Sequence, residues 1–138
     1  MINLSKIQIS VQTSIKNLEG LIFDLLSYFY IKIYLVILFL LNISIWALSF
    51  FIDSRIEGQQ IALHYNVDFG IDFYGDKNNI YIIPVLGLLI IIINFCLIAS
   101  VSRSRDRRFI SHVLMITSMV TNIILLTAVI SVYLINFW

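Results

Sequence analysis

Long apolar runs dominate this chain in three places, residues 33–52, 80–101 and 113–138, and all three runs are free of charged side chains. A bilayer core about 30 Å thick is crossed by about 20 helical residues, because an α-helix rises about 1.5 Å per residue. Each run reaches that length. The pattern therefore predicts an all-α membrane protein with three transmembrane helices, forming a single membrane domain over residues 1–138.

The residues before the first apolar run follow a helical period. Polar residues fall on one side of the helical wheel, and apolar residues recur on the other at spacings of four and three: Val11, Ile15, Leu18, Ile22, Leu25 and Phe29. This pattern predicts an amphipathic helix over residues 5–30. Such a helix can lie in the headgroup region of the membrane or pack against a partner's helix, and we favour the interfacial position.

The connection between the first two spans, residues 53–79, has a different period. Polar and apolar residues alternate strictly from His64 to Phe73, which is typical of an extended strand with two unlike faces. The polar face would carry His64, Asn66, Asp68, Gly70 and Asp72, and the apolar face Tyr65, Val67, Phe69, Ile71 and Phe73. The apolar face is expected to lie on the membrane or on neighbouring helices. The following residues 74–77 are expected to form a turn before the second span.

Charge is sorted between the two connections, although the net charge is only +1. Residues 102–112 carry four arginines against one acidic residue, whereas residues 53–79 carry five acidic residues against Arg55 and Lys77. The positive-inside rule therefore predicts a cytoplasmic arginine-rich loop, an N-terminus inside, and an external acidic loop and C-terminus. The arginines are expected to bind lipid headgroups rather than nucleic acid or an acidic partner: Arg103, Arg105, Arg107 and Arg108. The neighbouring His112 is expected to be an interfacial residue.

Composition agrees with a membrane protein, because 60% hydrophobic and 12% charged residues leave too little polar surface for a soluble globule. The single cysteine, Cys96, lies inside the second apolar run and excludes an internal disulfide. We therefore expect a multi-pass membrane protein with the lipid bilayer as its surroundings.

Three asparagines interrupt the apolar spans at similar depth. Asn42, Asn94 and Asn122 each lie about seven to nine residues from the predicted inner end of a span, or roughly 10 to 14 Å from the inner edge. Amides in hydrocarbon are unfavourable unless they are paired, so we expect the three to meet in the folded bundle. They would act as packing contacts, with a polar path for a substrate as the alternative. The hydroxyls of Thr117, Ser118 and Thr121 are expected to bond only to their own helix.

No pattern predicts catalysis by this chain. A nucleophile and base with suggestive spacing and a glycine-rich phosphate loop are lacking, and no charged residue lies deep in a span to support ion transport. The external acids do not follow the spacing of a twelve-residue calcium loop, and a single histidine does not match a zinc-hydrolase motif. We therefore predict neither an enzyme nor a metal site or cofactor.

The external segment resembles the bacterial family called domain of unknown function 1648. The resemblance covers about residues 46–100 and consists of a His-aromatic-Asn step, a Gly-x-Asp step and several single positions: His64-Tyr65-Asn66, Gly70-Ile71-Asp72, Tyr74-Gly75, Lys77 and Pro84. The proline that the family prefers two residues before the histidine is replaced here by Ala62. The best-known members are similar to SdpI-type immunity and signalling proteins. The resemblance therefore implies an external hairpin and a location in the bacterial cytoplasmic (inner) membrane.

Two classes of function follow. The first is a small membrane protein that acts by interaction, either immunity-like or regulatory, whose external loop recognises a membrane-protein or peptide partner or a second copy of the chain. The second is an accessory subunit of a larger membrane enzyme or transporter complex. The predicted partner-binding residues are His64, Asn66, Asp68, Gly70, Asp72 and Lys77.

Overall fold

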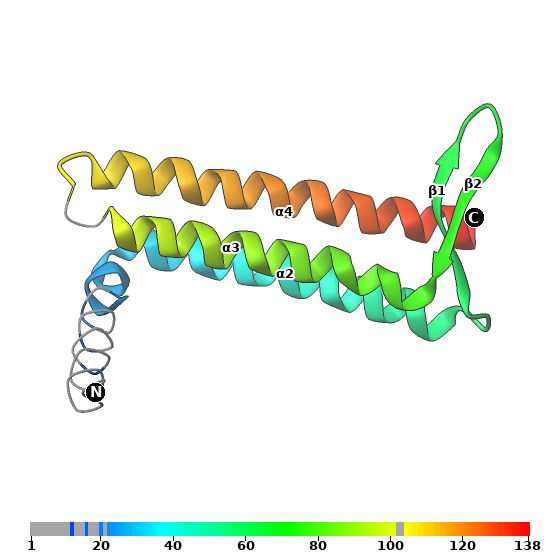
Figure 1. Ribbon diagram of the computed structural model, residues 1–138, viewed down its shortest axis with the longest axis horizontal. Helices are drawn as coiled ribbons and strands as arrows, with labels where there is room; N and C mark the ends of the chain where they lie inside the picture. The colour runs from blue at the N-terminus through cyan, green and yellow to red at the C-terminus, as the bar shows by residue number, and fades with distance from the viewer. Residues whose placement is uncertain (1–11, 13–15, 17–19, 21, 102–103) are drawn as a thin grey trace, which may run out of the picture.

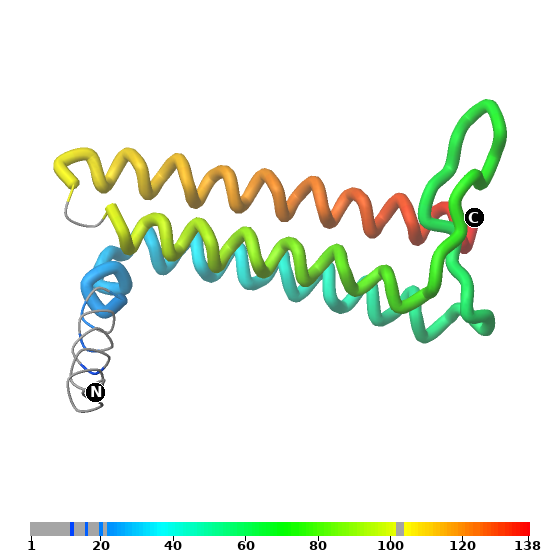
Figure 2. The backbone as a smooth tube through the Cα atoms, viewed as in Figure 1, coloured from blue at the N-terminus to red at the C-terminus, as the bar shows by residue number. Residues whose placement is uncertain are grey.

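Three long helices run side by side and form an elongated bundle (Figures 1 and 2). The computed structural model describes residues 12, 16, 20, 22–101 and 104–138. Helix α2 covers Phe29–Arg55, α3 covers Ile82–Ser100 after a short 3-10 helix η1 at Lys77–Tyr81, and α4 covers Arg107–Phe137. Each of the three is long and apolar enough to cross a membrane, which fits a multi-pass membrane protein.

Helix α2 extends beyond both ends of the apolar run that predicts it, and α4 begins before its run, whereas α3 lies within its run. Helix α2 includes Lys32, although the predicted span begins after this residue, and α4 starts at Arg107 rather than at residue 113. A helix can continue past the apolar run, because long basic side chains near its ends can place their charges in the polar interface. The apolar pattern located the spans but not the helix ends.

Most of the predicted amphipathic helix over residues 5–30 lies outside the described residues, including Val11, Ile15 and Leu18. Residues 22–27 are helical, and a bend at Tyr28 separates them from α2.

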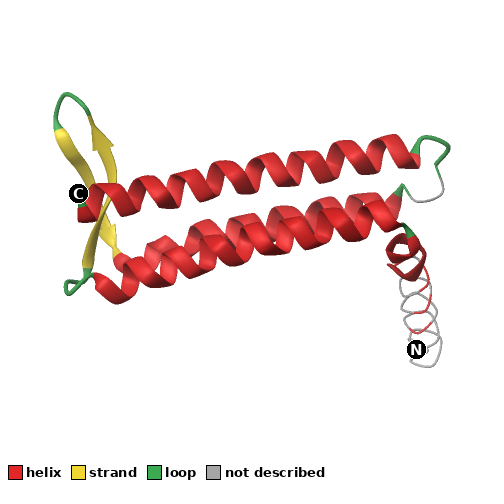
Figure 3. Cartoon of the chain, turned by 180° about the vertical axis from the view of Figure 1, so that it is seen from behind, coloured by secondary structure: helices red, strands yellow, loops and turns green. Residues whose placement is uncertain are grey.

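The connection between α2 and α3 is a β-hairpin and not the single strand that the alternation predicted (Figure 3). Strand β1 (Gln60–Asn66) pairs antiparallel with β2 (Gly70–Asp76), from Gln60 opposite Asp76 to Asn66 opposite Gly70. The chain reverses at residues 67–69, where the Asn66 side chain accepts a hydrogen bond from the Asp68 N–H at 2.9 Å and Gly70 has a φ of 78°. An L side chain rarely adopts that φ, so glycine permits the reversal.

The turn predicted at residues 74–77 is also displaced. Tyr74, Gly75 and Asp76 belong to β2, and the chain leaves the strand only at Lys77, where η1 begins. The Asp76 carboxylate accepts from the Asn78 N–H at 2.9 Å and so caps this 3-10 helix. Asp76 thus initiates the short helix, as Asp commonly does.

The core of the bundle is divided into two apolar clusters, one toward each end. The cluster near the hairpin contains Ile45, Ile52, Ile61, Ile80, Val129 and Val132, and the other contains Leu25, Ile31, Leu38, Ile98 and Met115. Buried polar or small residues lie on the same helix faces: Asn42, Ser49, Gly87, Asn94, Ser111, Ser118 and Asn122. Small residues let helices approach closely, which matters in a bilayer where apolar burial does not drive helix association.

Candidate functional site

The hairpin is fixed to the C-terminal end of α4 by one side-chain amide. Asn136 Oδ1 accepts from the Ala62 N–H at 3.1 Å, and Asn136 Nδ2 donates to the Ala62 carbonyl at 2.8 Å. The amide therefore occupies the edge of β1 as a third strand would. Ile61 and Ala62 are buried at this contact, so the base of the hairpin is held by packing as well as by hydrogen bonds.

A second anchor joins η1, which directly follows β2, to the end of α2. Lys77 Nζ lies 3.4 Å from Asp53 Oδ1 near the end of α2, and the Tyr81 hydroxyl donates to Asp53 Oδ2 at 2.9 Å. Lys77 was predicted to bind a partner. The structure instead places it at the base of the hairpin, paired with a carboxylate of its own chain and away from the other predicted recognition residues.

The exposed part of the hairpin carries a histidine–aspartate pair. His64 Nδ1 lies 2.6 Å from Asp72 Oδ1 across the two strands, and their side chains are 65% and 39% exposed. A single strand would have separated these residues along its length; the hairpin brings them together. The remaining predicted residues shape the reversal: Asn66 bonds the Asp68 N–H, Asp68 lies exposed within the turn, and Gly70 supplies the positive φ.

The apolar side chains of the hairpin tip are exposed among the described residues. Val67 and Phe69 are 88% and 82% exposed, and Phe73 and Tyr74 are more than half exposed. Only part of the predicted apolar face lies near a helix: Tyr65 and Ile71 line a hollow of about 380 Å³ with Leu134, Ile135 and Trp138. The tip therefore combines a polar pair with large apolar side chains that the rest of the described chain leaves uncovered.

A hydrogen-bonded amide layer separates the two apolar clusters. Asn42 Nδ2 donates to Asn122 Oδ1 at 3.3 Å and to the Pro84 carbonyl at 3.0 Å. Asn122 Nδ2 donates to the Gly87 carbonyl at 3.4 Å and to the Ser118 carbonyl at 3.0 Å. All three helices thus contribute to one network near the middle of the bundle.

Asn94 joins this layer only indirectly. Its Nδ2 donates to the Ser118 hydroxyl at 2.8 Å, one helical turn from Asn122 on α4. The structure therefore brings together two of the three predicted asparagines. Ser118 was expected to bond only to its own helix; it does so, to the Leu114 carbonyl at 3.2 Å, and it also accepts from Asn94. The spacing of four between Ser118 and Asn122 was the available signal for this shared helix face.

Gly87 makes the amide layer possible. A Cβ at this position would lie 2.6 Å from Asn122 Oδ1 and 2.8 Å from Asn42 Nδ2. Both distances are too short for a real contact, so any side chain would displace an amide. Sequence reasoning gave no role to this glycine, although a glycine three residues after Pro84 on an apolar helix is compatible with a close helix–helix approach.

Aromatic and basic residues pack together at the opposite end of the bundle, the arginine end. His112 stacks on Tyr30 with ring centroids 4.7 Å apart, and its Nδ1 lies 3.2 Å from the Tyr34 hydroxyl. Arg107 and Arg108 lie over the rings of Tyr28 and Tyr30. Of the predicted headgroup-binding arginines, Arg105 is exposed and Arg103 lies outside the described residues. His112 therefore joins the starts of α2 and α4.

Within residues 22–101 and 104–138 and the three described positions before them, no group of three or more His, Cys, Asp or Glu side chains is placed to hold a metal ion. Comparisons with models of known protein families, with curated proteins and with solved structures gave no match to this chain. The resemblance of residues 46–100 to the domain of unknown function 1648 stays a prediction from the sequence.

Proposed function

We propose that this chain is a small protein of the bacterial cytoplasmic membrane that acts by binding a protein or peptide partner through the hairpin β1–β2. The observation that carries this proposal is the contrast within the hairpin itself. Its base is fixed to α4 and α2 by Asn136 and by the Asp53–Lys77 pair, while its tip exposes the His64–Asp72 pair, Val67 and Phe69. A rigid base with an exposed, chemically mixed tip is suited to recognition.

The proposed orientation places the hairpin outside the cell and the arginine end inside. It rests on the arginines of residues 102–112 and on the acidic excess of residues 53–79. Reporter fusions at Arg105 and at Trp138 test it, and an external signal from Arg105 would reverse the orientation.

The binding mode we propose is strand addition at β2. The sheet of the described chain has two strands, and the edge of β1 is already occupied at Ala62 by Asn136. The other edge, along β2, keeps unpaired backbone groups that can pair with an extended peptide. Asp68 and Asp72 would favour basic side chains in that peptide, and the acidic loop would attract a cationic partner.

The resemblance to the domain of unknown function 1648 favours an immunity-like or regulatory form of this binding, with a secreted peptide as the partner. The exposed tip residues Val67 and Phe69 favour a second candidate, an accessory subunit whose tip packs against a neighbour in a larger complex. A secreted peptide would be captured from outside the cell, whereas a neighbouring subunit would be recovered from the membrane at fixed stoichiometry.

The test is capture by the double variant His64→Ala, Asp72→Ala. We expect it to lose the partner in affinity purification from the native membrane and to bind cationic peptide less well, while membrane insertion is unchanged. Asp106→Ala is the matched control, because it removes an exposed carboxylate at the arginine end. Equal capture by the double variant and the control, at equal expression, would reduce the hairpin to a structural connection.

A further inference from the structure

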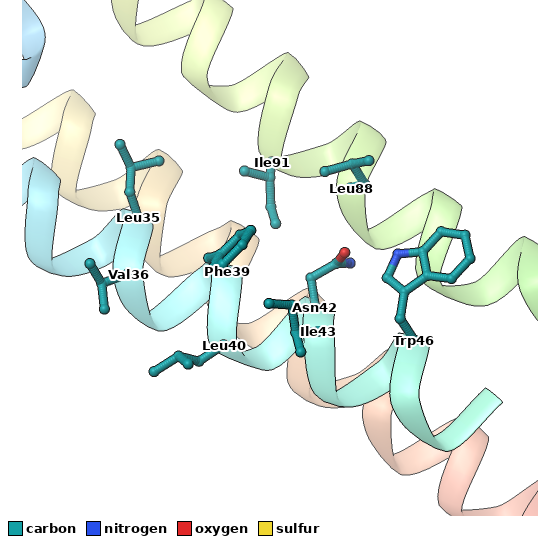
Figure 4. A pocket seen from close by; sticks show the side chains of 9 residues that line it. All are labelled: Leu35, Val36, Phe39, Leu40, Asn42, Ile43, Trp46, Leu88 and Ile91. Carbon is teal, nitrogen blue, oxygen red and sulfur yellow. The ribbon is translucent and has the colours of Figure 1, made fainter. Parts of the chain in front are cut away.

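A groove of about 590 Å³ lies between α2 and α3 on the outside of the bundle (Figure 4). Its walls are almost entirely apolar, and Asn42 and the indole nitrogen of Trp46 supply its polar groups: Leu35, Val36, Phe39, Leu40, Asn42, Ile43, Trp46, Leu88 and Ile91. Helices α2 and α3 each pack mainly against α4 and less against each other. The volume falls within the range of small-molecule sites, about 300–1,000 Å³.

The amide layer fixes which atom of Asn42 faces this groove. Pro84 presents only a carbonyl, and Asn122 must use its oxygen because its nitrogen donates to two carbonyls. Both contacts therefore require the Asn42 nitrogen. The Asn42 oxygen accepts no hydrogen bond from any described residue, although the residue is only 6% exposed. A bare acceptor in hydrocarbon is unfavourable, so this oxygen is suited to receive a donor from a bound molecule.

Trp46 supplies the complementary group one turn further along α2. Its indole N–H makes no hydrogen bond to the part of the chain that the structure describes, and the indole is held on its other side by ring contact with Tyr81, at 5.8 Å between centroids. Figure 4 shows the carboxamide of Asn42 and the indole nitrogen of Trp46 turned toward one another on the same side of α2. The groove thus presents one acceptor and one donor, which come from residues one helical turn apart on α2.

We propose that this groove binds a mainly apolar molecule of the bilayer that carries a hydroxyl group. One hydroxyl can donate to Asn42 Oδ1 and accept from Trp46 Nε1–H, while the rest of the molecule lies along Phe39, Leu88 and Ile91. A partner helix fits less well, because the groove involves residues 35–46 of α2 and only Leu88 and Ile91 of α3 rather than the length of the spans. The groove is a local hollow and not a continuous stripe.

Quenching of Trp46 fluorescence tests this proposal. The full chain with Trp138→Phe in detergent micelles keeps Trp46 as its only tryptophan. The probes are a terminally brominated long-chain alcohol and the bromoalkane of the same chain length, because bromine quenches indole on contact. We expect saturable quenching by the alcohol, with half-quenching at about a threefold to tenfold lower mole fraction than for the alkane, the effect of one or two hydrogen bonds.

Two variants, Leu88→Phe and Val120→Phe, distinguish binding in the groove from general partitioning of the probe into the micelle. Leu88→Phe should reduce quenching by filling the groove, and it removes no hydrogen-bonding side chain of the amide layer. Val120→Phe makes a similar change at a lipid-exposed position of α4 and should leave the curve unchanged. Asn42→Leu should remove the advantage of the alcohol over the alkane; if this variant fails to fold, the Leu88→Phe and probe comparisons still decide. Identical curves for alcohol and alkane, or quenching that Leu88→Phe does not alter, would overturn the proposal.

Discussion

The amide layer and the hairpin use polar side chains for opposite purposes. In the layer, Asn42 and Asn122 lie in the bundle interior. Asn42 donates to Asn122 and to the Pro84 carbonyl, and Asn122 donates to the Gly87 carbonyl and to the Ser118 carbonyl of its own helix. In the hairpin, His64 and Asp72 pair at an exposed position where water competes for the same groups. Polar contacts in the first region should therefore contribute to the stability of the fold, and those in the second mainly to what the protein can bind.

The largest expected effect is that of Gly87→Ala on stability. The added Cβ would overlap both amides of the layer and would separate α3 from α2 and α4. We expect a loss of about 2–3 kcal/mol of unfolding free energy, the usual cost of overpacking with a broken hydrogen bond. Thermal unfolding in detergent measures it. Gly58→Ala is the control, because its nearest neighbours lie 3.9 Å away or more, and an equal effect of the two substitutions would contradict the role of close approach.

Asn122 and Asn94 should differ in a predictable order. Asn122→Leu removes three interhelical or backbone contacts and should cost about 1–2 kcal/mol, whereas Asn94→Leu removes one contact and should cost about 0.6 kcal/mol. Both variants are compared with the parent chain by unfolding in detergent. A larger loss for Asn94→Leu would show that the layer is not centred on Asn122.

Asn136→Ala should loosen the hairpin with little effect on the bundle. It removes both hydrogen bonds to Ala62, so the Ala62 N–H should exchange with solvent faster by about tenfold, corresponding to roughly 1.4 kcal/mol. Hydrogen exchange measured residue by residue detects this. Asn78→Ala is the matched control, since the described chain gives that exposed side chain no hydrogen bond. Unchanged exchange at Ala62 would mean that the Asn136 amide does not hold the hairpin and that its packing and the Asp53–Lys77 pair do.

The smallest effect on stability is expected for Asp72→Ala. An exposed ion pair of this kind contributes at most about 1 kcal/mol, so unfolding in detergent should shift little even though partner capture is expected to fall. A large loss of stability would assign the pair to the fold rather than to recognition.

The sequence predicts some of these features and misses others for identifiable reasons. Long apolar runs indicate three helical spans, because hydrocarbon favours apolar side chains and requires that every backbone N–H and C=O be hydrogen-bonded within the segment. Strict alternation from His64 to Phe73 indicates extended backbone but not how that backbone pairs. The reversal depends on Asn66 and Gly70, and the alternation equally allows both residues to lie on the polar face of one strand.

Equal depth along the spans correctly predicted that Asn42 and Asn122 meet. Depth does not show which way a side chain points, and for this reason it did not predict that Asn94 bonds to Ser118 instead. Lys77 and Asp53 were counted as loop charges because nothing in their spacing shows that the end of α2 and the start of η1 come together. The anchor at Asn136 could not be predicted, because it joins residues 74 positions apart.

That separation has a consequence for synthesis on the ribosome. The hairpin emerges well before α4 is complete, and at about 5–20 residues per second the 74 residues between Ala62 and Asn136 take about 4–15 seconds. During this interval the edge of β1 has no side-chain amide to cover it and can pair with another chain. Completion of α4 closes that edge, so the final turn of α4 protects the earlier strand β1 from premature association.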